Sequence, residues 1–301
     1  MDQIVIFGAP NQKIIIMIKV HLNYLLLLLA GALLFPISCQ KSNVKKNIGL
    51  QLYSLRDSMR TNPVATVQEV GKMGFTFVEP AGYAEGKFYD ISPAEFKTLV
   101  ENNGMTVISS HTGMAVPDST TWDSVMAWWD ACIDAHLAVG AKYIVQPSMD
   151  SVAYQTLAGL QRYCDYFDAV GKKCKDKGIQ FGYHNHQAEL QQLEGQVIYD
   201  YMLQHTDSNL VVFEMDLYWL QEGGGNILNY FTNYPKRFPL WHVKDDKELG
   251  ASGKMDFKAI FENAALSGMK YPIVEQEEYT TTPIEGVKMS FDFLNTADFV
   301  K

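Results

Sequence analysis

Residues 142–146 read KYIVQ and residues 179–184 read IQFGYH, with a long helix-like run between them. Both short runs are rich in β-branched and aromatic residues, which favour a strand. From Ser151 to Lys177 apolar residues recur with the 3.6-residue period of a helix, and Gly178 supplies a common helix end. The stretch therefore predicts a strand–helix–strand unit of the kind that builds parallel sheets.

The same alternation extends in both directions from this unit. Ser92-Pro93-Ala94-Glu95 is a capping box that opens a helix ending before Gly104, and residues 121–137 form another helical run. Asp256-Phe257 opens a further helix that Gly268 stops. The strands are predicted at Ile48–Tyr53, Phe75–Glu79, Met105–Ser110, Lys142–Gln146, Ile179–His184, Leu210–Asp216, Leu240–Val243 and Tyr271–Glu275.

Eight strand–helix units in about 250 residues are typical of an α/β fold of the (β/α)₈ TIM-barrel type. A doubly wound open sheet is the alternative architecture. It is disfavoured because Tyr53-Ser54-Leu55-Arg56, rather than a glycine-rich phosphate loop, follows the first strand. No linker or low-complexity segment divides the run, so residues 39–301 are predicted to form one TIM-barrel domain.

Residues 1–38 have the features of an export signal rather than of folded structure. Lys13 and Lys19 precede the apolar run LLLLLAGALLF at residues 25–35, which is too short to span a bilayer as a helix. A small residue followed by Cys39 is similar to a lipoprotein cleavage site. We therefore expect a signal peptide over residues 1–38 and Cys39 as the lipidation site. Simple secretion or a buried N-terminal helix, which the flanking lysines disfavour, is the alternative. The expected location is the periplasm or outer membrane of a Gram-negative bacterium, with membrane attachment only through the lipid anchor.

The charge argues against a nucleic-acid partner, and the cysteine positions argue against cysteine metal ligands. The formal net charge is −9 and no cluster of Lys and Arg is present, which argues against nucleic acid as a partner. Beyond Cys39, the chain has Cys132, Cys164 and Cys174, all in helix-like runs and without the spacing of metal ligands. We interpret these three as inert, buried thiols.

Polar residues that can bind metals or transfer protons stand where the predicted strands end. Active sites of TIM barrels lie at this end of the barrel, and residues two apart on a strand share a face. The strand-end residues are Gln51 and Tyr53, Glu79, His111, Gln146, His184 and His186, Glu214 and Asp216, His242 and Lys244, and Glu275 and Glu277.

Taken singly, each of these residues could be structural or part of a charged loop. Taken together, acids and imidazoles that converge at one mouth need a compensating cation. Imidazole nitrogen and carboxylate oxygen suit one divalent ion such as Zn²⁺, Mn²⁺, Co²⁺ or Fe²⁺. Such an ion would polarise a substrate carbonyl while a carboxylate, His or Lys moves the neighbouring proton.

At these positions the chain resembles the xylose isomerase-like TIM-barrel superfamily, in its sugar phosphate isomerase/epimerase branch. The resemblance covers nearly all of residues 39–301. It rests on six stretches in order: Gly49 to Arg56, Ser110-His111-Thr112-Gly113, Tyr183-His184-Asn185-His186 with Glu189, Asp216-Leu217-Tyr218-Trp219, His242-Val243-Lys244-Asp245, and Val274-Glu275-Gln276.

The resemblance implies a metal site on the last four strands. Asp216, His242 and Glu275 match the family's ligands by position, and His184 stands where a glutamate is common. This exchange leaves open whether His184 or His186 binds the ion. It also departs from the epimerases in which two glutamates both bind metal and exchange protons.

Other strand-end residues are assigned catalytic or substrate-binding roles. Glu79, His111, His186 and Lys244 are the candidates for acid–base catalysis or substrate holding. Tyr218, Trp219 and Trp241 could provide flat faces for sugar rings, with core filling as the alternative, which is the stronger one for Trp241. The expected substrate-binding residues are Gln51, Tyr53, Gln146, Trp219 and Glu277.

The resemblance and the export signal together imply a small-molecule carbohydrate substrate. The favoured function is a divalent-metal-dependent isomerase or epimerase of an unphosphorylated keto-sugar, acting by proton abstraction next to a carbonyl. A lyase or hydrolase of 3-keto-glycosides at the cell envelope is the first alternative, and a carbohydrate-binding lipoprotein without turnover is the second. A DNA-repair endonuclease of the same superfamily is disfavoured by the acidic charge balance and the export signal.

Overall fold

The computed structural model describes residues 45–301. The predicted signal peptide and Cys39 lie outside the described residues. Lys46–Lys301 form one compact unit.

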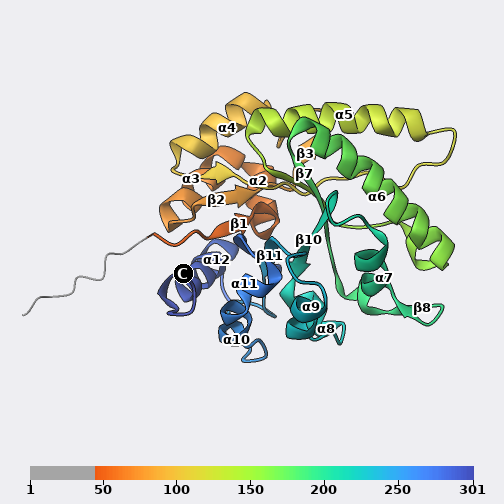
Figure 1. Ribbon diagram of the computed structural model, residues 1–301. Coiled ribbons are helices and arrows are strands. Elements are labelled where there is room, and N and C mark those ends of the chain that lie inside the picture. The colour runs from red at the N-terminus through yellow and green to blue at the C-terminus, as the bar shows by residue number, and fades with distance from the viewer. Residues whose placement is uncertain (1–44) are drawn as a thin grey trace, which may run out of the picture. The chain divides into compact units, whose positions relative to one another are not determined.

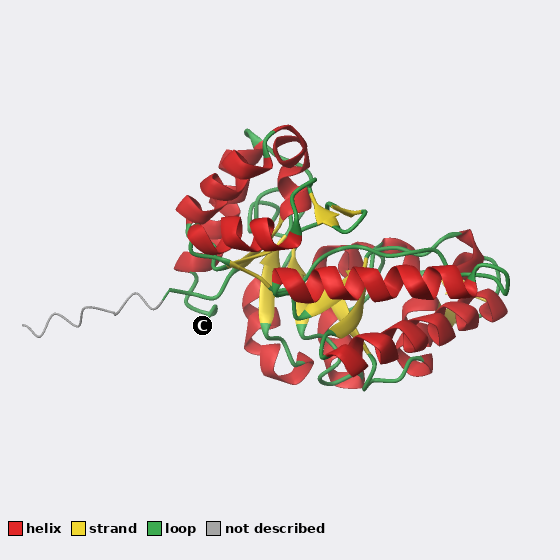
Figure 2. Ribbon diagram, turned by 90° about the horizontal axis from the view of Figure 1, so that it is seen from above, coloured by secondary structure: helices red, strands yellow, loops and turns green. Residues whose placement is uncertain are grey.

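Eight parallel strands form the central sheet, with helices outside it (Figures 1 and 2). The order of neighbouring strands is β5-β2-β1-β12-β11-β10-β7-β6. Backbone bonds from Tyr143 N to Ile108 O (3.1 Å) and from Val145 N to Ser110 O (2.9 Å) join the two ends of this order. The sheet therefore closes into the predicted barrel. Its strands are β1 (Gly49–Gln51), β2 (Phe77–Glu79), β5 (Thr106–Val107), β6 (Tyr143–Gln146), β7 (Gln180–His184), β10 (Val211–Asp216), β11 (Leu240–Val243) and β12 (Tyr271–Val274).

Helices and short hairpins connect the strands. The α-helices are α2 (Arg56–Thr61), α3 (Pro63–Met73), α4 (Pro93–Asn102), α5 (Trp122–Val139), α6 (Leu157–Lys177), α7 (Ile198–His205), α8 (Leu217–Glu222), α9 (Ile227–Asn233), α10 (Phe257–Glu262), α11 (Ala264–Ser267) and α12 (Pro283–Thr296). The 3-10 helices are η1 (Leu52–Leu55), η2 (Ser151–Tyr154) and η3 (Gln187–Leu190). The hairpins pair β3 (Tyr83–Ala84) with β4 (Lys87–Phe88), and β8 (Gln192–Leu193) with β9 (Gln196–Val197).

Two predicted helices are interrupted by polar side chains that compete for backbone groups. The run from Ser151 to Lys177 divides into η2 and α6, because Thr156 Oγ1 accepts a hydrogen bond from Gly159 N (3.0 Å) and starts a new helix. The run from Asp256 to Gly268 divides at Asn263, whose side chain donates to Ala259 O (2.8 Å).

The first predicted strand is also shorter than expected. Gln51 Oε1 accepts a hydrogen bond from Tyr53 N (2.9 Å) and turns the chain into η1. Tyr53 therefore lies on a 3-10 helix rather than on the strand face that carries Gln51.

The interior of the barrel has an apolar floor below a polar layer. Phe77 on β2 and Leu240 on β11 belong to a small buried apolar cluster inside the barrel. Two residues farther along the same strands stand Glu79 and His242, which share those faces. Gly49 makes room for this floor, since a Cβ there would lie 2.0 Å from the Phe77 ring.

The larger core lies between the sheet and the surrounding helices. Trp241 is fully buried there and stacks on Phe231 with ring centroids 5.0 Å apart, so it fills the core and offers no platform to a sugar. The thiols of Cys132, Cys164 and Cys174 are free and buried, as predicted.

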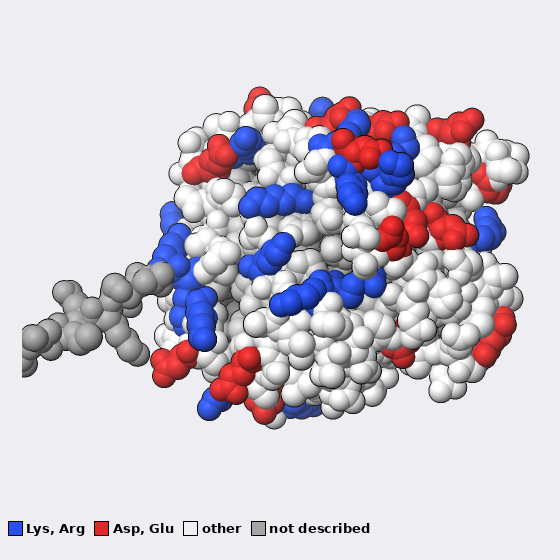
Figure 3. Space-filling view, in the orientation of Figure 1, with Lys and Arg blue, Asp and Glu red and all other residues white. Residues whose placement is uncertain are grey.

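The described surface has no membrane-spanning element and mixes its charges. Across residues 45–301, every helix is too short or too polar to cross a bilayer. On the face shown in Figure 3, basic side chains lie along the left edge and across the centre, and they are mixed with acidic ones at the upper edge.

Candidate metal centre

Four buried side chains meet at the carboxyl ends of β7, β10, β11 and β12. They are His184, Asp216, His242 and Glu275, and each offers one nitrogen or oxygen atom within 4.8 Å of the others. These are the four residues that the family resemblance implies as ligands. His184, rather than His186, belongs to the cluster.

Two distances between ligand atoms of the cluster suit one ion. His184 Nε2 lies 4.0 Å from Asp216 Oδ2, and His242 Nδ1 lies 3.0 Å from Glu275 Oε2. Ligand atoms about 2.0–2.2 Å from one ion can be up to about 4.4 Å apart. The two measured separations fall inside that limit.

Polar atoms without hydrogen-bond partners support the same interpretation. Asp216 Oδ1 accepts a hydrogen bond from Trp219 N (2.8 Å) and caps α8, which fixes the carboxylate. Asp216 Oδ2 is buried and has no hydrogen-bond partner, and His242 Nδ1 faces Glu275 Oε2 at 3.0 Å without hydrogen-bond geometry. Such atoms cost free energy unless something binds them. Two imidazoles and two carboxylates are a donor set that suits a divalent transition metal.

A second layer of polar side chains lies behind the histidines of the cluster. His242 Nε2 is 2.7 Å from Glu79 Oε1, and His184 Nδ1 is 3.4 Å from Glu214 Oε2. Each ring thus has a carboxylate near one nitrogen and a partner from the ligand cluster near the other. A carboxylate behind a metal-binding histidine orients the ring and selects the nitrogen that faces the ion.

The second layer is itself tied together. Gln51 Nε2 donates to Glu79 Oε1 (2.7 Å), and His111 Nε2 is 2.6 Å from Glu214 Oε2 and 3.2 Å from Glu79 Oε1. His111, His184, Glu214 and His242 form a second group whose ligand atoms lie within 4.8 Å of one another. The sequence placed Glu214 at a strand end but gave it no role. The sequence feature that could have indicated a role for Glu214 is its position two residues before Asp216, on the same strand face.

The protonation states of these groups differ because of their neighbours. Burial, together with the nearby Glu79, raises the pKa of Glu214. Burial opposes ionisation of Glu79 as well, but His111 and His242 lower its pKa. Burial and the other histidines hold the pKa of His184 well below its ordinary value. This shift favours the neutral form of His184, and a neutral imidazole is the form that binds metal.

Replacing Glu79 with alanine is expected to weaken metal binding about 10- to 100-fold, because His242 loses the carboxylate that orients it. Glu79→Gln should lose less, since an amide oxygen can still accept from the ring. Competition against a chelator measures both affinities. The matched control is Glu248→Ala, which removes a buried carboxylate bonded to Thr280 outside the cluster. Equal losses in Glu79→Ala and Glu248→Ala would contradict the orienting role.

Lys244 and His186 form the upper rim of the centre. Lys244 Nζ lies 3.2 Å from Glu275 Oε2, 2.7 Å from Glu277 Oε1 and 4.9 Å above the Trp219 ring. Burial opposes its charge, but the surrounding carboxylates raise the pKa of Lys244. The surrounding carboxylates thus favour the charged form of Lys244. The half-buried His186 ring is 4.8 Å from that of His184 and 6.5 Å from that of Trp219.

The remaining predicted substrate-binding residues occupy different environments. Gln51 is fully buried and engaged by Glu79, whereas Tyr53 has 44% of its surface exposed. Gln146 Nε2 donates to Met114 O (3.1 Å) and Ser148 O (2.9 Å), and so connects two loops at the rim. Their roles toward a substrate stay predictions.

Asn185 and Glu189 hold the loop after β7, and the sequence had given them no role. Asn185 Oδ1 accepts from Asp216 N (3.1 Å), and its Nδ2 donates to Asp216 O (3.4 Å), which joins the ends of two strands. Glu189 is buried and accepts hydrogen bonds from Tyr154, Tyr183 and the backbone of His186. Only the tertiary contacts reveal these functions, although both residues lie within the quoted motif.

Solved structures provide close relatives. Two sugar phosphate isomerase/epimerases from Parabacteroides distasonis are 33% and 31% identical to this chain. The first aligns with a TM-score of 0.80 over 85% of this chain and 100% of its own length. The second aligns with a TM-score of 0.81 over 88% of this chain and 99% of its own length. A 3-keto-D-glucoside 4-epimerase from E. coli, 18% identical, shares the fold with a TM-score of 0.65 over 84% of this chain and 100% of its own. No match is found among curated proteins.

The family comparison covers most of the barrel. Xylose isomerase-like TIM barrel proteins match residues 67–297, a span that includes β2 and every later strand of the sheet. Together with the fold, the buried cluster and the relatives above 30% identity, this match identifies the chain. It belongs to the xylose isomerase-like TIM-barrel family, with relatives described as sugar phosphate isomerases/epimerases.

Proposed function

We propose that this protein is a divalent-metal-dependent sugar isomerase or epimerase that abstracts a proton next to the carbonyl of an unphosphorylated keto-sugar. The observation that carries the proposal is the convergence of His184, Asp216, His242 and Glu275 in one buried cluster. Isomerase and epimerase activities in the names of related proteins support the reaction class.

The protein's own groups divide the work between binding and proton transfer. A divalent ion held by the four cluster residues would polarise the substrate carbonyl. Glu79 and Glu214 hold the two histidine rings from behind. Lys244 keeps a positive charge at the rim, where it can donate hydrogen bonds to sugar oxygens. His186 is the partly exposed imidazole outside the ligand cluster, and we assign it the transfer of the proton.

The preference for an unphosphorylated substrate follows from the charges at the rim. Lys244 already lies within ion-pair distance of Glu275 and Glu277, so its charge is offset by two carboxylates. These carboxylates would repel a phosphate dianion, which costs binding free energy. The relatives' names mention sugar phosphates, and this chain would differ from those names in its substrate.

A 3-keto-glycoside is the second candidate substrate. Its glycosidic bond would be broken by elimination, as in a lyase, or by hydrolysis. The fold neighbour from E. coli acts, by its name, on a 3-keto-D-glucoside. Proton abstraction next to a ketone also begins the elimination of a neighbouring glycosidic group. The same residues therefore serve either outcome, and product analysis separates them. Binding of a carbohydrate without turnover is the remaining alternative.

We also propose that the protein is exported and attached to the membrane through a lipid on Cys39. The support is the sequence of residues 1–39 alone. Labelling of cells with a radioactive fatty acid, with Cys39→Ser as the control, tests the attachment.

Metal analysis and proton exchange test the enzyme directly. We expect about one divalent ion per chain, and deuterium from solvent entering the carbon next to the carbonyl of a keto-sugar. Unphosphorylated keto-sugars and 3-keto-glycosides should be compared with their phosphorylated counterparts, with Mn²⁺, Co²⁺ and Zn²⁺ added in turn. Exchange without product would still exclude simple binding. Protein that holds metal but exchanges no proton with any member of the panel would support the non-catalytic alternative.

A further inference from the structure

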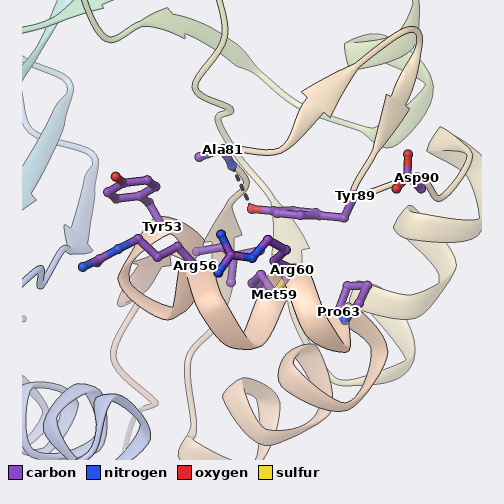
Figure 4. Close-up of a pocket in the computed structure, with 9 residues that line it drawn as sticks. Tyr53, Arg56, Met59, Arg60, Pro63, Ala81, Tyr89 and Asp90 are labelled. Carbon is purple, nitrogen blue, oxygen red and sulfur yellow. Dashed lines mark hydrogen bonds between the residues drawn. The ribbon is translucent and has the colours of Figure 1, made fainter.

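A pocket beside the metal centre has the features of a second binding site. It has a volume of about 400 Å³ and is lined by residues of η1 and α2, the first residue of α3, and the loops after β2 and β4. Figure 4 shows Tyr53 and Tyr89 on two sides of this space, with Arg56 and Arg60 along α2.

The pocket adjoins the centre through the chain itself. Tyr53 and Ala81 line the pocket. Tyr53 comes two residues after the strand-end residue Gln51, and Ala81 comes two residues after the strand-end residue Glu79. Two residues of chain span at most about 7 Å. Arg56 Nη2 also lies 3.4 Å from the carbonyl oxygen of Glu277, the residue whose carboxylate binds Lys244. A molecule that binds at the centre could therefore extend into the pocket.

Arg56 is a polar group in the pocket with unused binding capacity. A guanidinium has five N–H donors, and the long contact with Glu277 O uses one. None of the carboxylates that the structure describes lies within ion-pair distance of Arg56. Arg60, by contrast, is already paired with Asp57 at 2.8 Å. Arg56 also lies 5.1 Å above the Tyr53 ring, which keeps the guanidinium near the exposed aromatic face.

Tyr89 is held firmly as the opposite wall. Its hydroxyl accepts a hydrogen bond from Ala81 N (2.9 Å), and its backbone N–H donates to Gly82 O (2.8 Å). Tyr89 and Asp90 have φ angles of 51° and 64°, in the left-handed region that costs free energy for these residues. A Cβ on Gly82 would lie 2.3 Å from the Tyr89 ring, so the ring packs directly against the backbone. This geometry presents a rigid aromatic face.

We propose that this pocket binds a ring that carries a carboxylate, such as a uronic acid, joined to the sugar that reacts at the metal centre. Two tyrosines provide apolar faces for a ring, and a planar guanidinium matches a carboxylate with two parallel hydrogen bonds. A single unpaired arginine, with Asp90 also in the lining, suits one negative charge better than a phosphate dianion. The link to a reacting sugar rests on the proposed function, whereas carboxylate binding in the pocket does not.

Binding of simple probes to the full chain tests the pocket without any turnover. The probes are D-glucuronate, D-glucose, D-glucose 6-phosphate and 4-hydroxybenzoate, each titrated by ligand-detected NMR against protein with chelator and against metal-loaded protein. We expect D-glucuronate to bind at least about tenfold more tightly than D-glucose, because its carboxylate gains charge-assisted hydrogen bonds. Metal-free protein should retain this difference, so that a failure of the proposed enzyme would leave it intact.

Variants locate the site. Arg56→Gln should abolish the preference for D-glucuronate, and Tyr53→Leu should weaken both sugars. The matched control is Arg162→Gln, because Arg162 also donates to a single backbone carbonyl, that of Pro117, at another cavity. Equal binding of D-glucuronate and D-glucose, tighter binding of the phosphate, or an unchanged preference in Arg56→Gln would overturn the proposal. If 4-hydroxybenzoate competes with D-glucuronate and loses its binding in Arg56→Gln, the carboxylate site stands and its ring is assigned to an aromatic acid.

Discussion

Replacing His242 with alanine is expected to abolish the binding of one divalent ion per chain, with a loss of affinity larger than the 10- to 100-fold typical of an orienting residue. His242 lies between Glu79 Oε1, at 2.7 Å from Nε2, and Glu275 Oε2, at 3.0 Å from Nδ1. The substitution removes a ligand atom and leaves two buried acids without their imidazole. Elemental analysis of purified protein and titration with Co²⁺ measure the loss.

Substitution of a second buried histidine, His136, distinguishes a loss of metal binding from a loss of stability. Leaving a buried carboxylate without its hydrogen-bond partner costs about 1–3 kcal/mol, so His242→Ala should also lower the unfolding temperature. His136 is equally buried, but it binds Cys132 O (2.7 Å) on α5 and packs against Phe88. His136→Ala should therefore lower stability and keep the metal. Retention of a full complement of metal by His242→Ala would refute the proposed site.

Replacing His186 with asparagine is expected to lower kcat by about 10²- to 10⁴-fold, the usual contribution of a positioned proton-transfer group. Metal content should stay at one ion per chain, because His184, not His186, belongs to the ligand cluster. Washout of deuterium from the substrate carbon should fall by the same factor as turnover. The comparison thus assigns the two histidines of the His-Asn-His motif to different functions.

Two further variants complete this test. His184→Asn should lose the metal, which distinguishes a ligand from a proton-transfer group. His205→Asn changes an exposed histidine that stacks on Tyr201 at the end of α7, and it should leave kcat and metal content unchanged. If His186→Asn keeps full turnover, proton transfer belongs to another group, and the assignment of His186 is wrong.

The sequence predicted the barrel well because its signals are local. Strand-forming runs such as KYIVQ at residues 142–146 and helix stops such as Gly178 depend on neighbours within a few residues. The same signals failed where a polar side chain captures a backbone group. Thr156 divides one predicted helix and Gln51 ends the first strand early, and both effects depend on hydrogen bonds that periodicity does not describe.

The functional site likewise has features that the sequence predicted and features that only the tertiary structure shows. The order of strand-end residues, and their alternation on each strand face, determined by themselves that acids and imidazoles would gather at the mouth of the barrel. Only the tertiary structure decided that His184 joins the cluster while His186 stays on the rim. Only it placed Glu79 and Glu214 behind the histidines and left Arg56 without a carboxylate partner among residues 45–301. The physical reason is that a side chain's role depends on distances of 3–4 Å between strands far apart in the chain, and the curvature of the closed sheet sets those distances.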